Sequence, residues 1–362
     1  MKSKNFLVPT ALVVVFICVH VILLTMGNPK YYNLSRTLTQ WDGQHYLSIA
    51  RDGYEMFPCW FGQGYICGNV GWFPLLPMIG RIVAMPGIAY DWALILVSWL
   101  AFLIGTLMLY RLIESKYGER TALLSTVAML VFPGAFYFLT AFPNALYLML
   151  AVLTFVLIEQ RRYLWLWIPA GMLAVAHPSG SVIGLPLLYL FVRDWRSNTA
   201  RERLLLLAAM AAMVAAIATY FSYYAVTFGD FFLYSKFQAQ SYYAHEVTFP
   251  LIPIVQLFMR PSADYQAFAA LVLVIAVVAV FYRRTIPVSW QVFMFGLLLF
   301  SPTMGTTDSY FRYVEAAFPM FAMVGLRAQS RSGKYLYGLY VVAALILWWF
   351  VFLNAFKTGQ LR

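Results

Sequence analysis

Few side chains in this chain could do acid–base chemistry, because 62% of its 362 residues are hydrophobic and only 11% are charged. Asp42 is the first candidate. At 3.6 residues per turn it shares a helix face with Tyr46 and Ile49, so its carboxylate points with the apolar side of a predicted amphipathic helix. A carboxylate in such a setting costs free energy unless it has a partner or a function. Two interpretations stay open: a general base, or a helix-start residue in a capping box with Thr39.

The opposite face of the same helix is polar. Arg51 and Asp52 are adjacent on it and predict a solvated ion pair. Glu55 follows them. It is either solvated as well, or covered by the Gly- and aromatic-rich loop that comes next, in which case it would join a binding site.

Arg312 and His177 are candidates for binding an anion. Arg312-Tyr313 opens an apolar segment directly after a loop, and an arginine at headgroup depth can bind a phosphate with two parallel hydrogen bonds. The alternative is an interfacial arginine that reaches toward water or pairs with Glu315, three residues on. His177 lies at the break His177-Pro178-Ser179-Gly180, where it could bind a phosphate or a sugar hydroxyl, or only cap the kink.

A third group of polar side chains lies between residues 227 and 264. Amides bind sugar hydroxyls and aromatic rings pack on the apolar face of a sugar, so this segment is a candidate sugar-binding loop. The alternative is an aromatic belt at the membrane interface. The side chains concerned are Gln238, Gln240, Tyr242, Tyr243, His245 and Glu246.

Long apolar runs must position these side chains. Only helices and closed barrels satisfy their backbone within lipid, and the alternation of a barrel is absent, so we expect an all-α, multi-pass membrane protein. The run from Phe6 to Thr25 lacks the small-x-small cleavage site of a signal peptide and is expected to remain as the first span. The eleven expected spans are 6–25, 91–110, 120–139, 144–159, 163–179, 181–192, 204–226, 265–282, 286–301, 312–327 and 335–353.

The segment 72–88 contains Pro74, Pro77, Arg81 and Pro86, so we expect it to be re-entrant or interfacial. With the N-terminus in the cytoplasm, the predicted cytoplasmic segments hold 16 of the 25 Lys and Arg residues and 5 of the 14 Asp and Glu residues. The whole net charge of +11 therefore lies on that side. Membrane topology explains the net positive charge of the chain, and nucleic-acid binding is not indicated.

The long loops fall on the extracytoplasmic side, where we expect the chemistry. They are residues 26–90, the first long loop, and residues 227–264, the second long loop, both within a single domain 1–362. Cys59 and Cys67 lie close together in the first long loop and are expected to form a disulfide, the alternative being two unpaired thiols. The histidines and cysteines lack the spacing of metal ligands, so no metal site is predicted.

Three motifs stand out in chain order: Trp41-Asp42-Gly43…Ile49-Ala50…Gly53-Tyr54, then Trp72-Phe73-Pro74-Leu75-Leu76-Pro77, then Arg312-Tyr313…Phe318-Pro319. A weaker one is Phe228-Gly229-Asp230 with Gln238 beyond it. Together they resemble the PIG-V family, the GPI mannosyltransferase II proteins and their prokaryotic relatives, within the GT-C class of membrane glycosyltransferases. The chain departs from that pattern twice. Asn144 stands where the family often has an acidic residue, and His177 where it often has arginine.

The resemblance implies a GT-C-type helical bundle that transfers mannose, or a similar hexose, from a polyprenyl-phosphate donor at the outer membrane face with inversion. Asp42 would deprotonate the acceptor hydroxyl. The donor phosphate would be held by Arg312, His177 and Tyr313, without a metal or a cofactor. Candidates for binding the acceptor or the sugar are Trp41, His45, Glu55, Gln238 and His245. The acceptor would be a glycolipid, a glycan or a protein, and the membrane a prokaryotic plasma membrane in preference to the endoplasmic reticulum.

A transporter or flippase of lipid-linked sugars is the competing interpretation, because it would use the same basic and aromatic cavity without chemistry. Transporters tend to show internal repeats and broken helices near the bilayer midplane. No repeat is evident, and the polar residues gather on one face, which favours the enzyme. An inactive relative acting as a subunit is a third interpretation.

Overall fold

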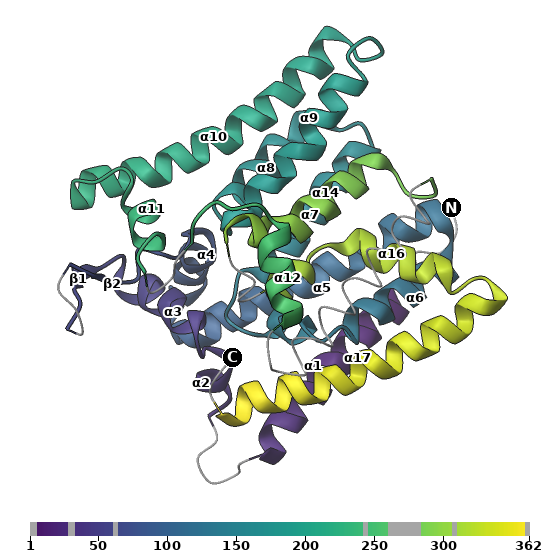
Figure 1. The fold of residues 1–362 in the computed structure, drawn as a ribbon, viewed down its shortest axis with the longest axis horizontal. Helices are drawn as coiled ribbons and strands as arrows, with labels where there is room; N and C mark the ends of the chain where they lie inside the picture. Colours follow the sequence, from purple (N-terminus) through teal and green to yellow (C-terminus); the bar gives the residue numbers. More distant parts are fainter. Residues whose placement is uncertain are drawn as a thin grey trace.

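The computed structural model describes residues 6–27, 33–60, 64–241, 245–259, 284–305 and 310–358. This part of the chain is built almost entirely from helices, with one two-stranded hairpin (Figure 1). The α-helices are α1 (Leu7–Gly27), α2 (Leu34–Leu38), α3 (Asp42–Asp52), α4 (Leu75–Ala84), α5 (Tyr90–Tyr117), α6 (Glu119–Leu130), α7 (Asn144–Glu159), α8 (Trp167–Ala174), α9 (Gly184–Arg193), α10 (Ala200–Phe228), α11 (Leu233–Gln238), α12 (Leu251–Met259), α14 (Val288–Thr303), α15 (Tyr310–Val314), α16 (Phe318–Arg327) and α17 (Arg331–Thr358). The 3-10 helices are η1 (Ala135–Leu139), η2 (Tyr163–Trp165) and η3 (Pro178–Ile183), and the strands are β1 (Met56–Pro58) and β2 (Ile66–Gly68).

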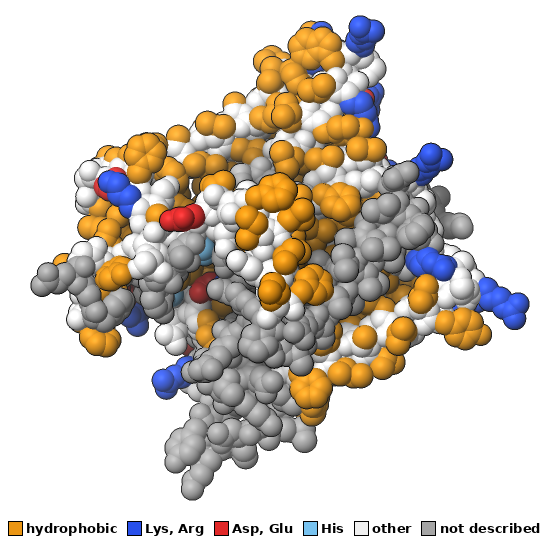
Figure 2. Space-filling model, viewed as in Figure 1, with side chains coloured by type: hydrophobic (Ala, Val, Ile, Leu, Met, Phe, Trp, Pro, Cys, Tyr) orange, Lys and Arg blue, Asp and Glu red, His pale blue; other side chains and the backbone are white. Residues whose placement is uncertain are grey.

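Four of the described helices are long and apolar enough to cross a membrane, namely α1, α5, α10 and α17. The 29 residues of α10 extend for about 43 Å at 1.5 Å per residue, more than the roughly 30 Å of a bilayer core. Only 22% of the apolar window of α10, and likewise of α17, is buried. Figure 2 shows hydrophobic side chains along the outward surfaces of both helices. These apolar surfaces suit lipid, and the chain is a multi-pass membrane protein as predicted.

Four of the expected spans are not continuous α-helices in the structure: 120–139, 163–179, 181–192 and 312–327. Proline explains each break, because it lacks the N–H that a helix interior needs. Pro133 follows the end of α6, Pro178 opens η3, and Pro319 stands in the first turn of α16. The predicted kink between 163–179 and 181–192 is confirmed, since η3 connects α8 to α9 there. The expected span 265–282 lies outside the described residues.

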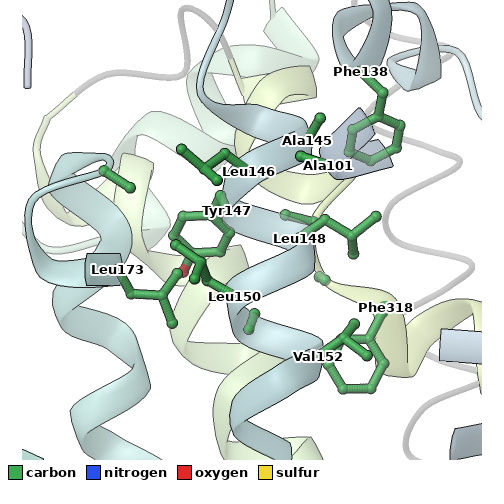
Figure 3. Close-up of a cluster of buried hydrophobic side chains, with 14 of the residues drawn as sticks. Ala101, Phe138, Ala145, Leu146, Tyr147, Leu148, Leu150, Val152, Leu173 and Phe318 are labelled. Atoms are coloured by element: carbon green, nitrogen blue, oxygen red, sulfur yellow. The ribbon is translucent and has the colours of Figure 1, made fainter. Parts of the chain in front are cut away.

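The centre of the molecule is α7. It packs against α5, and Gly105 of α5 permits the contact, because a Cβ there would lie 3.0 Å from the Met149 Cα. Figure 3 shows the side chains of α7 enclosed by Leu173 of α8 and Phe318 of α16. An apolar helix that is buried on all sides fixes the position of its first residue, Asn144.

The first long loop folds into short elements beside the bundle: α2, α3, the hairpin and α4 (Figure 1). Helix α4 has ten residues and extends for about 15 Å, half of a bilayer core, in agreement with the prediction that 72–88 is re-entrant or interfacial. Arg81 of α4 donates hydrogen bonds to the carbonyls of Ala50 and Arg51, at 2.7 and 3.1 Å. These carbonyls belong to the last turn of α3, which has no helical donors of its own. Helix α4 therefore holds the C-terminal end of α3.

The hairpin confirms the predicted disulfide. Strands β1 and β2 pair antiparallel, with Phe57 opposite Cys67, and Cys59 is bonded to Cys67. The backbone also closes the loop, because the Cys59 N–H donates to the Tyr65 carbonyl at 3.1 Å.

Alkylation of the unreduced, denatured protein is expected to modify one cysteine, Cys18, and alkylation after reduction all three. Intact mass measures both. Closing a loop of this length stabilises the hairpin by about 2–3 kcal/mol in the chain-entropy view, so a Cys59→Ser/Cys67→Ser variant should be cut faster there by protease. Three alkylated cysteines without reduction would contradict the bridge.

Candidate active site

Helix α3 presents Asp42 to the interior as its periodicity predicts. Tyr46, Ile49 and Ala50 are buried, while Arg51 and Asp52 form an exposed ion pair on the other face. Asp42 is the first residue of the helix. A carboxylate in a first helical turn is stabilised by the free N–H groups and the dipole of that end.

The capping-box interpretation of Asp42 is wrong. The Thr39 hydroxyl donates to the Ser35 carbonyl at 2.9 Å instead, and Trp41 takes the position before the helix with no capping hydrogen bond from its side chain. Trp41 is half-buried and has a φ of 55°, which is unusual for a side chain of that size. Backbone in such a conformation gathers at functional sites.

The partner of Asp42 is Arg312, 270 residues away, which donates a hydrogen bond from Nη1 to Oδ2. The Arg312 side chain is 17% exposed and that of Asp42 is 29% exposed. The guanidinium carbon lies 5.2 Å from the ring centre of Phe142 and 5.8 Å from that of Tyr137. Arg312 thus points into the molecule over aromatic faces, and the interpretation of an arginine reaching toward water is wrong.

A stacked pair of rings forms the other wall beside Asp42. The His45 imidazole lies 3.5 Å from the Trp72 ring, at an interplanar angle of 13°. The Trp72 side chain also contributes to lowering the pKa of the Asp42 carboxyl group. The carboxylate therefore has the Arg312 guanidinium as its donor and keeps a partly open side for a substrate.

Electrostatics keep Asp42 ionised. Burial raises the pKa of Asp42, but the charge and hydrogen bond of Arg312, with His45 and Trp72, lower it by more, so the pKa lies below its ordinary value. Burial lowers the pKa of His45, against the opposing charge of Asp42. The site therefore combines an ionised carboxylate with a neutral imidazole at neutral pH.

The lowered pKa of Asp42 predicts that activity persists in mild acid. A base with a lowered pKa loses its charge only as the pH falls through that lowered value, so the acid limb of kcat/KM is expected below the ordinary pKa of an aspartate. The measurement is kcat/KM from about pH 3.5 to 8. An acid limb centred near pH 6 that persists in a His45→Gln variant would contradict the paired carboxylate.

His177 and Tyr313, predicted to help Arg312 bind a phosphate, lie beside it. The His177 and Tyr313 ring centres are 4.9 Å apart, and both residues line a small cavity with Arg312. The cavity has about 10 Å³ of free volume, room for one water. His177 also caps the kink, since its Nδ1 lies 2.8 Å from the Ser179 hydroxyl and accepts from the Ser179 N–H. The two interpretations of His177 are compatible.

Gln238 and His245 make hydrogen bonds within the protein. The Gln238 side chain donates to the Gly71 carbonyl at 3.1 Å, and its oxygen lies 2.6 Å from His245 Nδ1. Gln240 bonds the backbone of Ile66 in the hairpin from both ends of its amide, at 2.5 and 3.1 Å. These amides join the second long loop to the first. That Gln238 and His245 bind a sugar stays a prediction, while Tyr242 and Tyr243 lie outside the described residues.

Glu55 is also not where a binding role needs it. Its side chain is exposed, so the following loop does not cover it. It lies beyond the C-terminal end of α3, an eleven-residue helix about 16 Å long whose other end carries Asp42. The solvated interpretation of Glu55 is correct.

Three tyrosine hydroxyls that were not predicted from the sequence hold the backbone at Trp72. The hydroxyls of Tyr54 and Tyr220 donate to the Trp72 carbonyl at 2.7 and 3.1 Å, and that of Tyr224 donates to the Val70 carbonyl at 2.8 Å. The spacing of Tyr220 and Tyr224 on one face of α10 was the available signal. This spacing predicts which face of α10 points inward, but it does not predict which backbone carbonyls the two hydroxyls bind.

Comparison with known proteins identifies the fold. Neither a protein-family model nor a curated protein matches the sequence. ArnT from Cupriavidus metallidurans, solved with undecaprenyl phosphate bound, is 17% identical with a TM-score of 0.59, and the match covers 98% of this chain and 66% of ArnT. The apo oligosaccharyltransferase of Archaeoglobus fulgidus is 13% identical with a TM-score of 0.52, over 94% of this chain and 55% of that protein.

A third structure agrees with these two. AglB from Archaeoglobus fulgidus, in complex with an inhibitory peptide and a dolichol-phosphate, is 12% identical with a TM-score of 0.51, over 94% of this chain and 55% of AglB. These neighbours are GT-C glycosyltransferases, so the chain has the GT-C fold. It spans about two thirds of the length of ArnT and about half that of the oligosaccharyltransferase.

Proposed function

We propose that this protein is a GT-C glycosyltransferase that moves a hexose from a polyprenyl-phosphate donor to an acceptor hydroxyl. The observation that supports it most is the contact of Asp42 with Arg312. A partly buried carboxylate and a guanidinium meet there from opposite ends of the chain, beside the stacked His45 and Trp72 rings. This arrangement offers a base for the acceptor and a cation for an anionic leaving group in one place.

The reaction needs little else from the protein. Asp42 takes the proton of the acceptor hydroxyl as its oxygen attacks the anomeric carbon of the donor. The bond from that carbon to the phosphate oxygen breaks, and the electron pair stays on the phosphate, which Arg312 stabilises. Attack on the face opposite the leaving group inverts the anomeric configuration. Since a guanidinium supplies the positive charge, metal independence stays our prediction.

The similar solved structures and the apolar helix surfaces both support a lipid-phosphate donor. ArnT is described with undecaprenyl phosphate and AglB with dolichol-phosphate, so lipid-phosphate carriers suit this fold. The apolar surfaces of the surrounding helices offer a lipid tail a place beside the site. Mannose as the sugar, an extracytoplasmic site and a prokaryotic plasma membrane belong to the proposal through the PIG-V resemblance and the positive-inside charge pattern.

The test is an assay of the purified protein in lipid nanodiscs and in sealed vesicles. It uses a polyprenyl-phosphate mannose labelled in the sugar, with glycolipid, lipid-linked oligosaccharide and peptide acceptors. We expect labelled acceptor, free polyprenyl phosphate and an inverted anomeric configuration by NMR. Movement of the donor across the vesicle membrane without a glycosidic product would reject the transferase and favour a flippase.

A further inference from the structure

A fully buried carboxyl group lies next to the turn that carries Arg312. Glu315 directly follows the last residue of α15 and is 0% exposed. Its Oε1 accepts a hydrogen bond from the Asn144 side chain at 2.6 Å, and its Oε2 has no hydrogen-bond partner within the described part of the chain. A buried carboxyl group with one unsatisfied oxygen is costly, so the position calls for a reason.

Asn144 connects this carboxyl group to the backbone of Arg312. The Asn144 side-chain nitrogen carries two hydrogens, and it donates to the Arg312 carbonyl at 2.8 Å as well as to Glu315. That carbonyl is in the last turn of α15, where carbonyls have no helical donor. Asn144 therefore caps α15, and it does so from the first residue of the buried helix α7.

The cap fixes the direction of the arginine. Asn144 and Arg312 line the same one-water cavity, and the Arg312 guanidinium leaves the capped turn toward Asp42. Glu315 holds the Asn144 amide in the orientation that the cap requires.

We propose that Glu315 is a positioning residue that, through Asn144, sets the Arg312 guanidinium for the phosphate of a lipid-linked donor. This inference rests on the proposed function. It assigns no contact between Glu315 and substrate. Residue 315 acts on Arg312 through its hydrogen bond with Asn144. The site therefore requires from residue 315 an oxygen that accepts this hydrogen bond.

Binding of undecaprenyl phosphate to the full-length protein tests it, with undecaprenol, which lacks the phosphate, as the matched ligand. Glu315→Ala is expected to weaken undecaprenyl phosphate binding about tenfold, the effect of one lost hydrogen bond at a buried group, and to leave undecaprenol binding unchanged. Glu315→Gln should stay within about threefold of the wild type, because its amide oxygen accepts the same hydrogen bond. Asn144→Ala should match Glu315→Ala, and the double variant should add nothing further.

Glu114→Ala is the control variant. Arg111 and Glu114 repeat the three-residue spacing at the C-terminal end of α5, so this variant should bind undecaprenyl phosphate as the wild type does. If the wild type binds undecaprenyl phosphate no better than undecaprenol, the proposed function fails. If it does bind, and Glu315→Ala binds equally well or Glu315→Gln is as weak as Glu315→Ala, the positioning role is overturned. Should Glu315→Ala not fold, Asn144→Ala alone decides, since wild-type affinity in that variant also overturns the role.

Discussion

Asp42→Asn is expected to lower kcat by about 10²–10⁴-fold, the usual contribution of a general base. Asparagine keeps the size of the side chain but cannot take a proton from the acceptor hydroxyl. Binding of undecaprenyl phosphate should be retained, because the Arg312 guanidinium keeps its positive charge and is no longer paired with a carboxylate at position 42. Initial rates of mannose transfer at saturating donor measure the first effect, and equilibrium binding the second.

Asp52→Asn on the same helix is the matched control. Asp52 is exposed, pairs with Arg51 and lies at the other end of α3, so its removal should leave kcat within about twofold. Turnover by Asp42→Asn at the rate of Asp52→Asn would remove Asp42 as the base.

Arg312→Ala is expected to lower kcat/KM for the donor by about 10²–10³-fold, the effect of removing a donor aimed at developing charge. The variant loses the cation for the phosphate and also leaves the Asp42 carboxylate without its ionic partner. Because the charge and hydrogen bond of Arg312 are the largest contributions that lower it, the pKa of Asp42 should rise and the acid limb of activity should move to higher pH. Donor affinity and the pH profile are both measured.

Arg312→Lys separates charge from geometry. Lysine retains the positive charge but not the planar fork of donors, so an intermediate loss is expected. Arg51→Ala, which removes an exposed arginine from α3, serves as the control and should change donor affinity little. Unchanged donor affinity in Arg312→Ala, in protein whose thermal unfolding is cooperative, would return Arg312 to a structural role.

Local patterns made part of this site predictable. The period of 3.6 residues places Asp42 with Tyr46 on the inward face of α3, and this follows from helix geometry alone. The Cys59–Cys67 bridge is likewise local, since a hairpin needs only a short loop to bring the two sulfurs together. The apolar runs indicate a membrane protein, because their composition excludes a solvated surface.

The contacts that complete the site depend on packing between distant elements. Nothing near Arg312 in the sequence indicates Asp42 as its partner, and the three-residue spacing indicates Glu315 instead. The Gln238 amide has the chemistry to bind a sugar. Only the structure shows that it donates one of its hydrogens to the Gly71 carbonyl of the first long loop. Helix breaks were also hard to predict, because hydropathy averaged over a span does not register one proline.

The bonds between the two long loops define what could be exchanged in a chimaeric enzyme. Gln238 is the last residue of α11, and Gln240 follows the helix. Their side chains hold the backbone at Gly71 and Ile66. The Gly71 position has no room for a Cβ beside the Phe237 ring. A transplant of the first long loop alone would arrive without the amides that fix Trp72 against His45 and Asp42. The smallest graft that carries its own substrate wall is therefore the first long loop together with residues 220–241, which also bring the Tyr220 and Tyr224 hydroxyls.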